Sequence, residues 1–392
     1  MRHFAHLPES DRRRLFAVAP CEFGRGADVA TLAVALGATL YMPGSRPTLA
    51  DDLDRTAARG GLSVVICLED AVADGDVEAA QRNAVGQLRV FAERRHGAPD
   101  EGPLVFVRVR RPEQITGIVA QLGPAAGVLS GFVLPKFTDL TGVAFLDAIE
   151  EAATASGVRL LAMPVLESAE VIHRESRIEV LTAVRAVLDK RRDSVLAVRI
   201  GATDLCAAYG IRRGQEITIY DVRVVADAIA DIVNVLGRAD DSGHVVTGAV
   251  WEYFSQQQRL FKPRLRESLF SSREAAGLRR DMITSDTEGL LREVVLDKAN
   301  GLTGKTVIHP SHVPAVHALM VVSAEEYADA SDVVRADGRG GGGVCASSYH
   351  NKMNESKPHR AWAERTLRRA TAFGVAADDV GVVDLLMAGR PA

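Results

Sequence analysis

The sequence predicts an α/β fold of the (β/α)8 TIM-barrel class, and three observations indicate it. Eight short apolar runs recur along the chain, the segments between them have helical periodicity, and 392 residues leave room for additions to a barrel of roughly 250 residues. The runs are apolar throughout rather than alternating, which is typical of parallel strands buried on both faces. A doubly wound parallel sheet is the alternative that the same strand–helix alternation allows.

The eight runs predict strands at residues 38–42, 63–68, 104–109, 131–135, 159–166, 195–200, 245–250 and 306–309. Intervening segments such as 143–156 (VAFLDAIEEAATAS) and 220–236 (YDVRVVADAIADIVNVL) have apolar residues at helical spacing. We expect three regions: an N-terminal extension at 1–37, the barrel domain at 38–335, and a C-terminal region at 336–392. The glycine run at 340–343 favours a hinge, followed by a lid segment and a basic terminal helix.

Composition excludes several classes of protein. Hydrophobic residues make up 47% and charged residues 25%, and the formal net charge is −4 without a long basic block, so we expect no nucleic-acid partner. No run of about 18 apolar residues indicates a membrane span. The four cysteines, Cys21, Cys67, Cys206 and Cys345, are far apart and form no CxxC pair. This spacing, with a charged N-terminal stretch, predicts a reduced, cytoplasmic protein.

Charged side chains gather where the predicted strands end, which is where barrel enzymes carry their chemistry. Glu69 and Asp70 follow the second strand, Arg108 lies in the third, Glu167 follows the fifth and Asp204 follows the sixth. Carboxylate oxygens with open coordination positions suit magnesium or manganese rather than zinc. Magnesium usually takes one or two protein carboxylates, and two carboxylates on adjacent strands would meet that need, with Mn²⁺ as the alternative metal.

Seven motifs lie in order at these strand ends: LYMPGSRP, VICLEDAV, VFVRVR, GFVLPK, PVLESA, RIGATDL and VIHPSHV. Together they span about residues 38–322, and in this order the chain resembles the HpcH/HpaI aldolase and citrate lyase β-subunit family. The resemblance implies that Glu167 and Asp204 ligate Mg²⁺ and that Arg108 holds a carboxylate or carbonyl oxygen of the substrate. It implies that Glu69 and Asp70 lie beside the metal. One departure is LESA, where relatives commonly have IETA.

The same resemblance implies a substrate site around these groups. The backbone of Gly201 and Ala202 would face the substrate, and Arg46 and Lys136 at the barrel mouth would bind it. The implied substrate is a small molecule, either an acyl-CoA or an oxo or hydroxy acid. The implied reaction cleaves or forms a carbon–carbon bond β to an acyl carbonyl, through an enolate that the metal stabilises. Relatives assemble as trimers or hexamers, so we expect a homo-oligomer.

The C-terminal run HNKMNESKPHR resembles the lid of malyl-CoA and citramalyl-CoA lyase-like relatives. Lys352 and Met353 match that lid, and Glu355 stands where the relatives have Asp, with two extra residues before Pro358. The resemblance makes Glu355 the candidate acid or base, delivered by the lid of the same or a neighbouring subunit. The longer motifs around 195–221 and 244–254 are similar to a subgroup of C–C bond lyases found with tellurium-resistance-type gene clusters.

Alternatives remain for these assignments. The charged groups at the strand ends could form structural salt bridges, Asp70 could cap the next helix, and Glu355 could be a surface charge. The chain could be a non-catalytic assembly subunit with a metal-binding barrel. It could also bind ATP or GTP, since ANGLTGKT at 299–306 fits a relaxed P-loop pattern. A P-loop runs from a strand into a helix, however, and here a helix is predicted before the loop and a strand after it.

Overall fold

The computed structural model describes residues 1–95, 102–254, 287–338 and 343–388. Residues 340–342 of the predicted glycine hinge lie outside the described residues. Within these ranges no helix is long and apolar enough to cross a membrane.

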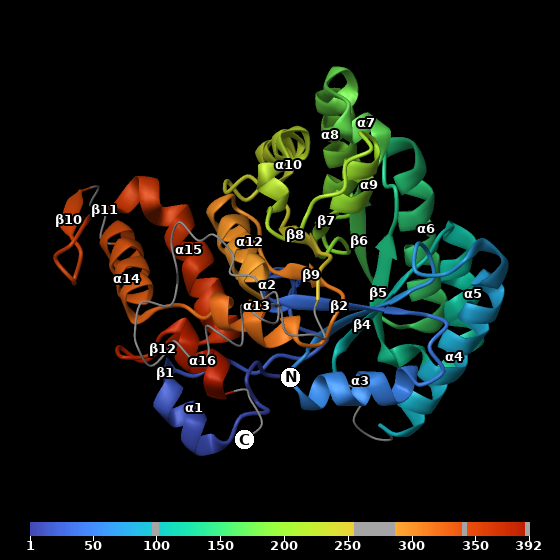
Figure 1. Cartoon of the computed structure of the whole chain (residues 1–392), viewed down its shortest axis with the longest axis horizontal. Helices are drawn as coiled ribbons and strands as arrows, with labels where there is room; N and C mark the ends of the chain where they lie inside the picture. Colours follow the sequence, from blue (N-terminus) through green and yellow to red (C-terminus); the bar gives the residue numbers. More distant parts are fainter. Residues whose placement is uncertain (96–101, 255–286, 339–342, 389–392) are drawn as a thin grey trace.

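Eight parallel strands close into a barrel, which confirms the predicted fold and rules out the doubly wound sheet (Figure 1). Each strand pairs with the next in chain order, and the last pairs with the first, so no sheet edge remains. All eight predicted strands form, although the sixth is shorter than its apolar run. The strands are β2 (Ala38–Pro43), β3 (Ser63–Cys67), β4 (Leu104–Arg108), β5 (Leu129–Leu134), β6 (Leu161–Leu166), β7 (Val198–Ile200), β8 (Val246–Trp251) and β9 (Lys305–Val307).

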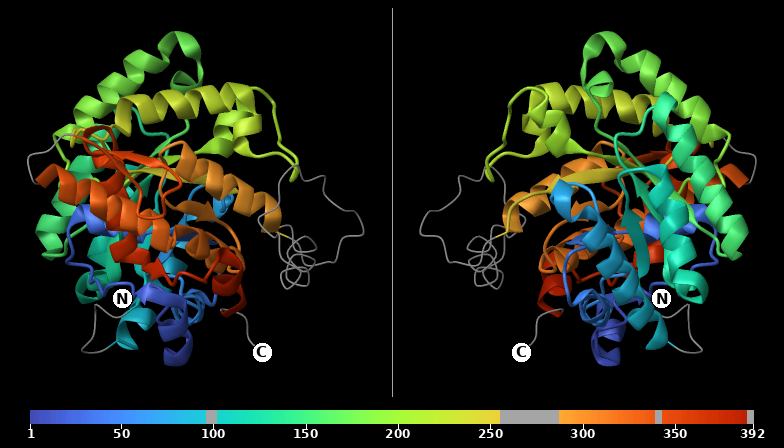
Figure 2. Two further views of the ribbon diagram at one scale, coloured as in Figure 1. Left: turned by 90° about the vertical axis from the view of Figure 1, so that its left-hand side faces the viewer. Right: turned by 90° about the vertical axis from the view of Figure 1, so that its right-hand side faces the viewer.

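Helices follow the strands and cover the barrel, because each has one apolar face that must be buried. They are α3 (Leu49–Ala58), α4 (Val77–Glu93), α5 (Pro112–Leu122), α6 (Asp139–Ser156), α7 (Ala169–Ile172), α8 (Arg174–Asp189), α9 (Ala202–Ala207), α10 (Arg223–Leu236), α12 (Thr287–Ala299) and α13 (His312–Met320). Short 3₁₀ turns lie at η1 (Asp74–Asp76), η2 (Gly123–Val128) and η3 (Ile219–Asp221). Both side views show α8 and α10 packed together along one side of the barrel (Figure 2).

The N-terminal extension and the C-terminal region pack together beside the barrel. Strand β1 (Phe16–Val18) pairs antiparallel with β12 (Val375–Ala376). Helix α2 (Val29–Ala35) packs against α15 (Ser356–Phe373), the predicted basic helix, and α1 (Glu9–Leu15) contacts α16 (Val382–Ala388). Helix α14 (Ala324–Gly338) lies along α15, and a hairpin of β10 (Val344–Ala346) and β11 (Met353–Glu355) joins them (Figure 1).

Candidate functional site

Three of the predicted carboxylates meet on one arginine at the carboxyl ends of the strands. The Nη2 of Arg108 is 2.8 Å from Oε2 of Glu69 and 2.8 Å from Oε1 of Glu167, and its Nη1 is 3.1 Å from Oδ2 of Asp70. Arg108 and Glu167 are buried, whereas the side chain of Asp70 is 52% exposed. Because β3, β4 and β6 end at the same rim of a closed barrel, side chains 98 positions apart in the chain become neighbours.

Lys136 joins this cluster twice. It follows β5 with a φ of 46°, a left-handed conformation that is uncommon for a residue with a side chain. In that conformation its backbone N–H donates to Oε1 of Glu167 at 2.9 Å, and its Nζ lies 3.0 Å from Oε1 of Glu69. Lys136 therefore helps to orient Glu167 and to balance the charge of Glu69.

The pKa of Glu167 is raised to about 7, mainly by burial, with Arg108 acting in the opposite direction and the negative charge of Asp204 contributing to the rise. Burial also raises the pKa of Asp70 to about 6, together with its hydrogen bond to Glu69 and the charge of Asp204. Burial opposes ionisation of Glu69 too, but hydrogen bonds from Asp70 and Lys136 and the charge of Arg108 leave its pKa lowered. The site therefore holds more negative charge than its cations compensate.

Asp204 lies in the first turn of α9 and is half-buried. Its charge raises the pKa of Glu167, Asp70 and Lys136, which indicates that it lies among them. Within the described ranges its carboxylate forms no salt bridge or hydrogen bond, and Oε2 of Glu167 accepts no hydrogen bond either. Four carboxylates stand against the two cations Arg108 and Lys136, a formal excess of two negative charges that matches one divalent cation.

The described residues contain no group of three or more His, Cys, Asp or Glu that could hold a metal ion. Magnesium usually takes one or two protein carboxylates, with water and substrate oxygens completing its coordination. The chemistry of the donors and the excess negative charge fit Mg²⁺ at Glu167 and Asp204.

The backbone of Gly201 lies directly beside Glu167. Gly201 is the N-cap of α9, and a Cβ at this position would lie 2.2 Å from Oε2 of Glu167. Only glycine allows the carboxylate to lie so close to the chain. Ala202 begins α9, and its side chain is buried.

Two predicted residues do not join the cluster. Arg46 pairs with Asp52 of α3 at 2.9 Å, and its side chain is 49% exposed. Glu355 ends β11 and is the N-cap of α15, where its backbone N–H donates to Nδ1 of His359 at 3.0 Å. Strand β11 packs against α14 and α15, and in Figure 1 it lies on the far side of the molecule from β4, β5 and β6. Within one chain, therefore, Glu355 stays away from Glu167.

The structure adds supporting residues that sequence reasoning missed. Thr203, next to Asp204, donates through Oγ1 to Oε1 of Glu252 at 2.8 Å, and the buried Arg213 contacts Oε2 of Glu252 at 3.2 Å. These contacts fix the turn that carries Asp204. The position of Glu252 directly after a predicted strand could have indicated that it lies at the rim. Nothing in the neighbouring sequence, however, distinguishes the buried Arg213 from Arg212.

The loop at 299–306 is not built as a P-loop. It runs from α12 into β9, so no helix N-terminus follows it. Lys305 is fully buried, with its Nζ 2.6 Å from Oε1 of Glu293 and 2.8 Å from Oδ2 of Asp297. Its ammonium group is thus neutralised inside the protein and faces away from solvent.

A family model described as C-C_Bond_Lyase of the TIM-Barrel fold matches residues 30–375. No curated protein sequence matches the chain. Solved structures with the same fold include a protein CitE from Mycobacterium tuberculosis in complex with magnesium, acetoacetate and coenzyme A, which is 22% identical, with a TM-score of 0.50 over 86% of this chain and 99% of that one.

Two further solved structures also share the fold. A citrate lyase from Burkholderia xenovorans LB400 is 16% identical, with a TM-score of 0.58, and covers 90% of this chain and 96% of its own. A Haloferax volcanii malate synthase, as a magnesium and glyoxylate complex, is 13% identical, with a TM-score of 0.50 over 89% of this chain and 97% of that one.

Proposed function

Because this chain belongs to the C–C bond lyase family of the TIM-barrel fold, we propose that it is a Mg²⁺-dependent carbon–carbon bond lyase. The proposed reaction cleaves or forms a bond β to an acyl carbonyl. The observation that carries the proposal is the pair of carboxylates at the ends of β6 and β7: Glu167 keeps Oε2 without a hydrogen bond, and Asp204 has no partner, among the described residues.

When bound, Mg²⁺ would supply positive charge beside an oxygen on which negative charge develops. The protein groups around it have separate tasks. Arg108 orients Glu167 and holds Asp70 at the more exposed edge of the cluster. A substrate carboxylate would compete with Asp70 for Nη1 of Arg108, since Asp70 is the easiest of its three partners to displace.

A proton must also be moved at the reacting carbon or hydroxyl group. The pKa of Asp70 is raised to about 6 by burial and by neighbouring carboxylates, so this side chain can both accept and donate a proton near neutral pH. Glu355 is the second candidate. It would have to come from a neighbouring subunit, because its own chain keeps it in the β10–β11 hairpin.

The proposed substrate is an oxo or hydroxy acid, or an acyl-CoA. The CitE structure that shares the fold holds acetoacetate and coenzyme A, and the malate synthase structure holds glyoxylate. In this chain, Lys136 offers a cation at the rim, with a side chain that is 56% exposed. Arg46, paired with Asp52, would have to leave that pair in order to reach a ligand.

The proposal is tested by proton exchange in heavy water. The full chain with Mg²⁺ should exchange the α-protons of a bound acyl-CoA or oxoacid, and Asp204→Ala should lose both exchange and Mg²⁺ binding. Asp193→Ala, at an exposed position, is the matched control and should retain both. If the protein binds Mg²⁺ but exchanges no α-proton with any of a broad panel of acyl-CoA and oxoacid compounds, the proposed lyase activity is overturned and a role as an assembly subunit is favoured.

A further inference from the structure

A cavity of about 910 Å³ lies at the opposite end of the barrel from the carboxylate cluster. Its lining includes Val195, Val245 and Thr303, which precede β7, β8 and β9, whereas Glu167 and Asp204 follow their strands. Helices α2 and α15 close its other side, so the cavity separates the barrel from the C-terminal region. Its volume is in the range of small-molecule pockets.

The lining of the cavity carries more cationic than anionic side chains. Six arginine and lysine residues line it, against four aspartate and glutamate residues. Two of those acids are already engaged: Glu326 pairs with Arg369, and Glu364 pairs with Arg360, both at 2.9 Å. In the part of the chain that the structure describes, no carboxylate pairs with these lining cations: Arg238, Lys298, Arg365 and Arg368.

The cations also repel one another in pairs. The pKa of Lys298 is lowered to about 8, mainly by burial and also by the charge of Arg369, against the opposite effect of Glu326. Burial also lowers the pKa of Arg365, with Arg368 as the second cause. Lys298 keeps one acceptor, the carbonyl of Leu319 at 2.9 Å, and Arg365 keeps one, the carbonyl of Gly237 at 2.8 Å. Lys298 and Arg365 each have further N–H groups to donate. A bound anion would therefore reduce the repulsion between Lys298 and Arg369 and between Arg365 and Arg368.

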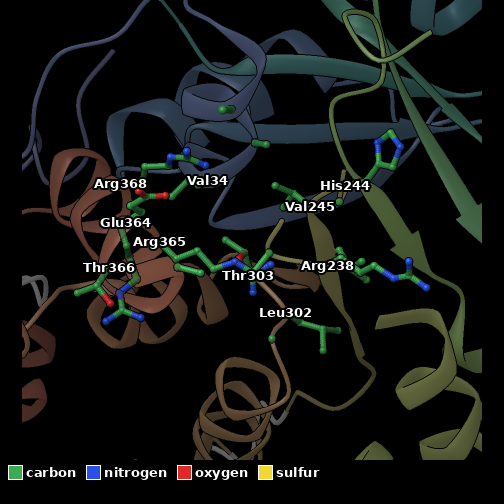
Figure 3. Close-up of a pocket in the computed structure, with 18 of the residues that line it drawn as sticks. Val34, Arg238, His244, Val245, Leu302, Thr303, Glu364, Arg365, Thr366 and Arg368 are labelled. Carbon is green, nitrogen blue, oxygen red and sulfur yellow. The ribbon is translucent and has the colours of Figure 1, made fainter. Parts of the chain in front are cut away.

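Apolar side chains complete the lining. Val34, Val245 and Leu302 lie around the opening in Figure 3, and the side chain of Arg365 reaches from α15 towards Thr303. Trp362, on α15, also lines the cavity and is 40% exposed. These apolar side chains suit an organic group attached to the anion. The indole ring of Trp362 could stack on such a group if the group contains a flat ring.

We propose that this cavity binds a small molecule that carries a phosphate or diphosphate group, with Lys298 and Arg365 as its main ligands and its organic part against Trp362. The ligand would join α15 to the start of the barrel strands. The site is separate from the carboxylate cluster and does not depend on the proposed lyase activity.

The test is a titration of the full chain with inorganic pyrophosphate and, in a second arm, with a nucleoside diphosphate. A chelator keeps the protein free of metal, so that neither ligand can bind through Mg²⁺ at Glu167 and Asp204. The chain has two tryptophans, and Trp251 is fully buried, so a change in fluorescence reports Trp362. Calorimetry measures the same affinity without the fluorophore, and Trp362→Phe should lose the fluorescence change.

Lys298→Met and Arg365→Gln should each weaken binding at least about tenfold, since each removes a charged hydrogen-bond donor. The control is Lys357→Met. Lys357 lies on α15, as Arg365 does, but it is exposed and does not line the cavity, so the affinity of this variant for either ligand should not change. Tighter binding of the nucleotide than of pyrophosphate identifies an organic ligand, and equal affinity identifies an inorganic one. Absence of saturable binding in both arms, or equal weakening in Lys357→Met, overturns the proposal. Lys298→Arg guards against misfolding, because it retains the charge.

Discussion

The carboxylate of Glu167 lies directly against the backbone of Gly201, so closely that a Cβ at position 201 would come within 2.2 Å of Oε2 and 2.4 Å of the Glu167 Cβ. Glu167 is held from the other side by Arg108 and by the backbone N–H of Lys136, so it cannot retreat without losing those bonds. The position of the predicted metal ligand thus depends on the absence of a side chain one strand away.

Gly201→Ala is therefore expected to weaken Mg²⁺ binding by at least about tenfold, because the added methyl group displaces Oε2. Calorimetric titration with Mg²⁺ measures the effect. The matched control is Gly86→Ala in α4, where an added Cβ meets nothing within 4 Å. Alanine there should leave Mg²⁺ affinity unchanged and stabilise the helix slightly. Unchanged affinity in Gly201→Ala would contradict the placement of Glu167 in the site.

Mg²⁺ affinity should rise with pH, because the metal needs the charged carboxylate while burial raises the pKa of Glu167 to about 7 from its ordinary value of 4.5. Between those two pKa values the folded, metal-free protein holds a proton that the unfolded chain has released, so its stability falls as the pH rises through that window. Titrations near about pH 6 and about pH 8 should differ roughly tenfold in affinity. Glu167→Gln should bind weakly at both, and a flat profile for the natural protein would exclude Glu167 as a ligand.

Arg108→Met should lower the free energy of unfolding of the metal-free protein by roughly 3 kcal/mol, because Glu69 and Glu167 are buried and would lose their shared cation. Added Mg²⁺ should recover part of the loss by binding the folded state. Arg46→Met removes an ion pair whose arginine is 49% exposed, and should cost less than about 1 kcal/mol. Denaturant unfolding compares the two variants, and equal losses would argue against the burial of Glu69 and Glu167 on Arg108.

Lys305→Met tests the P-loop reading. The change leaves Glu293 and Asp297 buried without their ammonium partner, so we expect a loss of roughly 3 kcal/mol or more in the free energy of unfolding. Any ATP or GTP that binds the natural protein in equilibrium dialysis should also bind Lys305→Met, because the Lys305 ammonium group is buried against Glu293 and Asp297 and cannot reach a ligand. Nucleotide binding that disappears in Lys305→Met while stability stays the same would reverse this conclusion.

A trans role for Glu355 can be tested by mixing subunits. If the lid of one subunit serves the site of another, Glu355→Gln and Asp204→Ala should each be inactive in proton exchange alone, and mixed oligomers should regain part of the activity. Mixing unfolded chains before refolding allows the subunits to combine. Recovery is not expected if Glu355 only caps α15, and in that case Glu355→Gln alone should remain active.

The sequence by itself predicted the barrel and the carboxylate rim. Buried parallel strands need continuous apolar runs, so all eight strands could be located from local composition, including the short β7. The charged residues at the strand ends could be grouped because a closed parallel barrel brings those ends to one rim. The sequence also showed that a helix precedes the loop before Lys305 and a strand follows it, which is the opposite of the order in a P-loop. This could be predicted because it depends only on neighbouring segments of the chain.

The tertiary structure alone decided how the charges pair. Coulomb interactions depend on distance through space, which barrel closure sets and sequence spacing does not. Arg108 thus joins three carboxylates, Lys136 turns into a left-handed conformation to reach two of them, and Arg46 turns away to Asp52. Docking of α15 on α2 likewise removed Glu355 from the rim and enclosed the basic cavity, because distant segments met to bury their apolar faces.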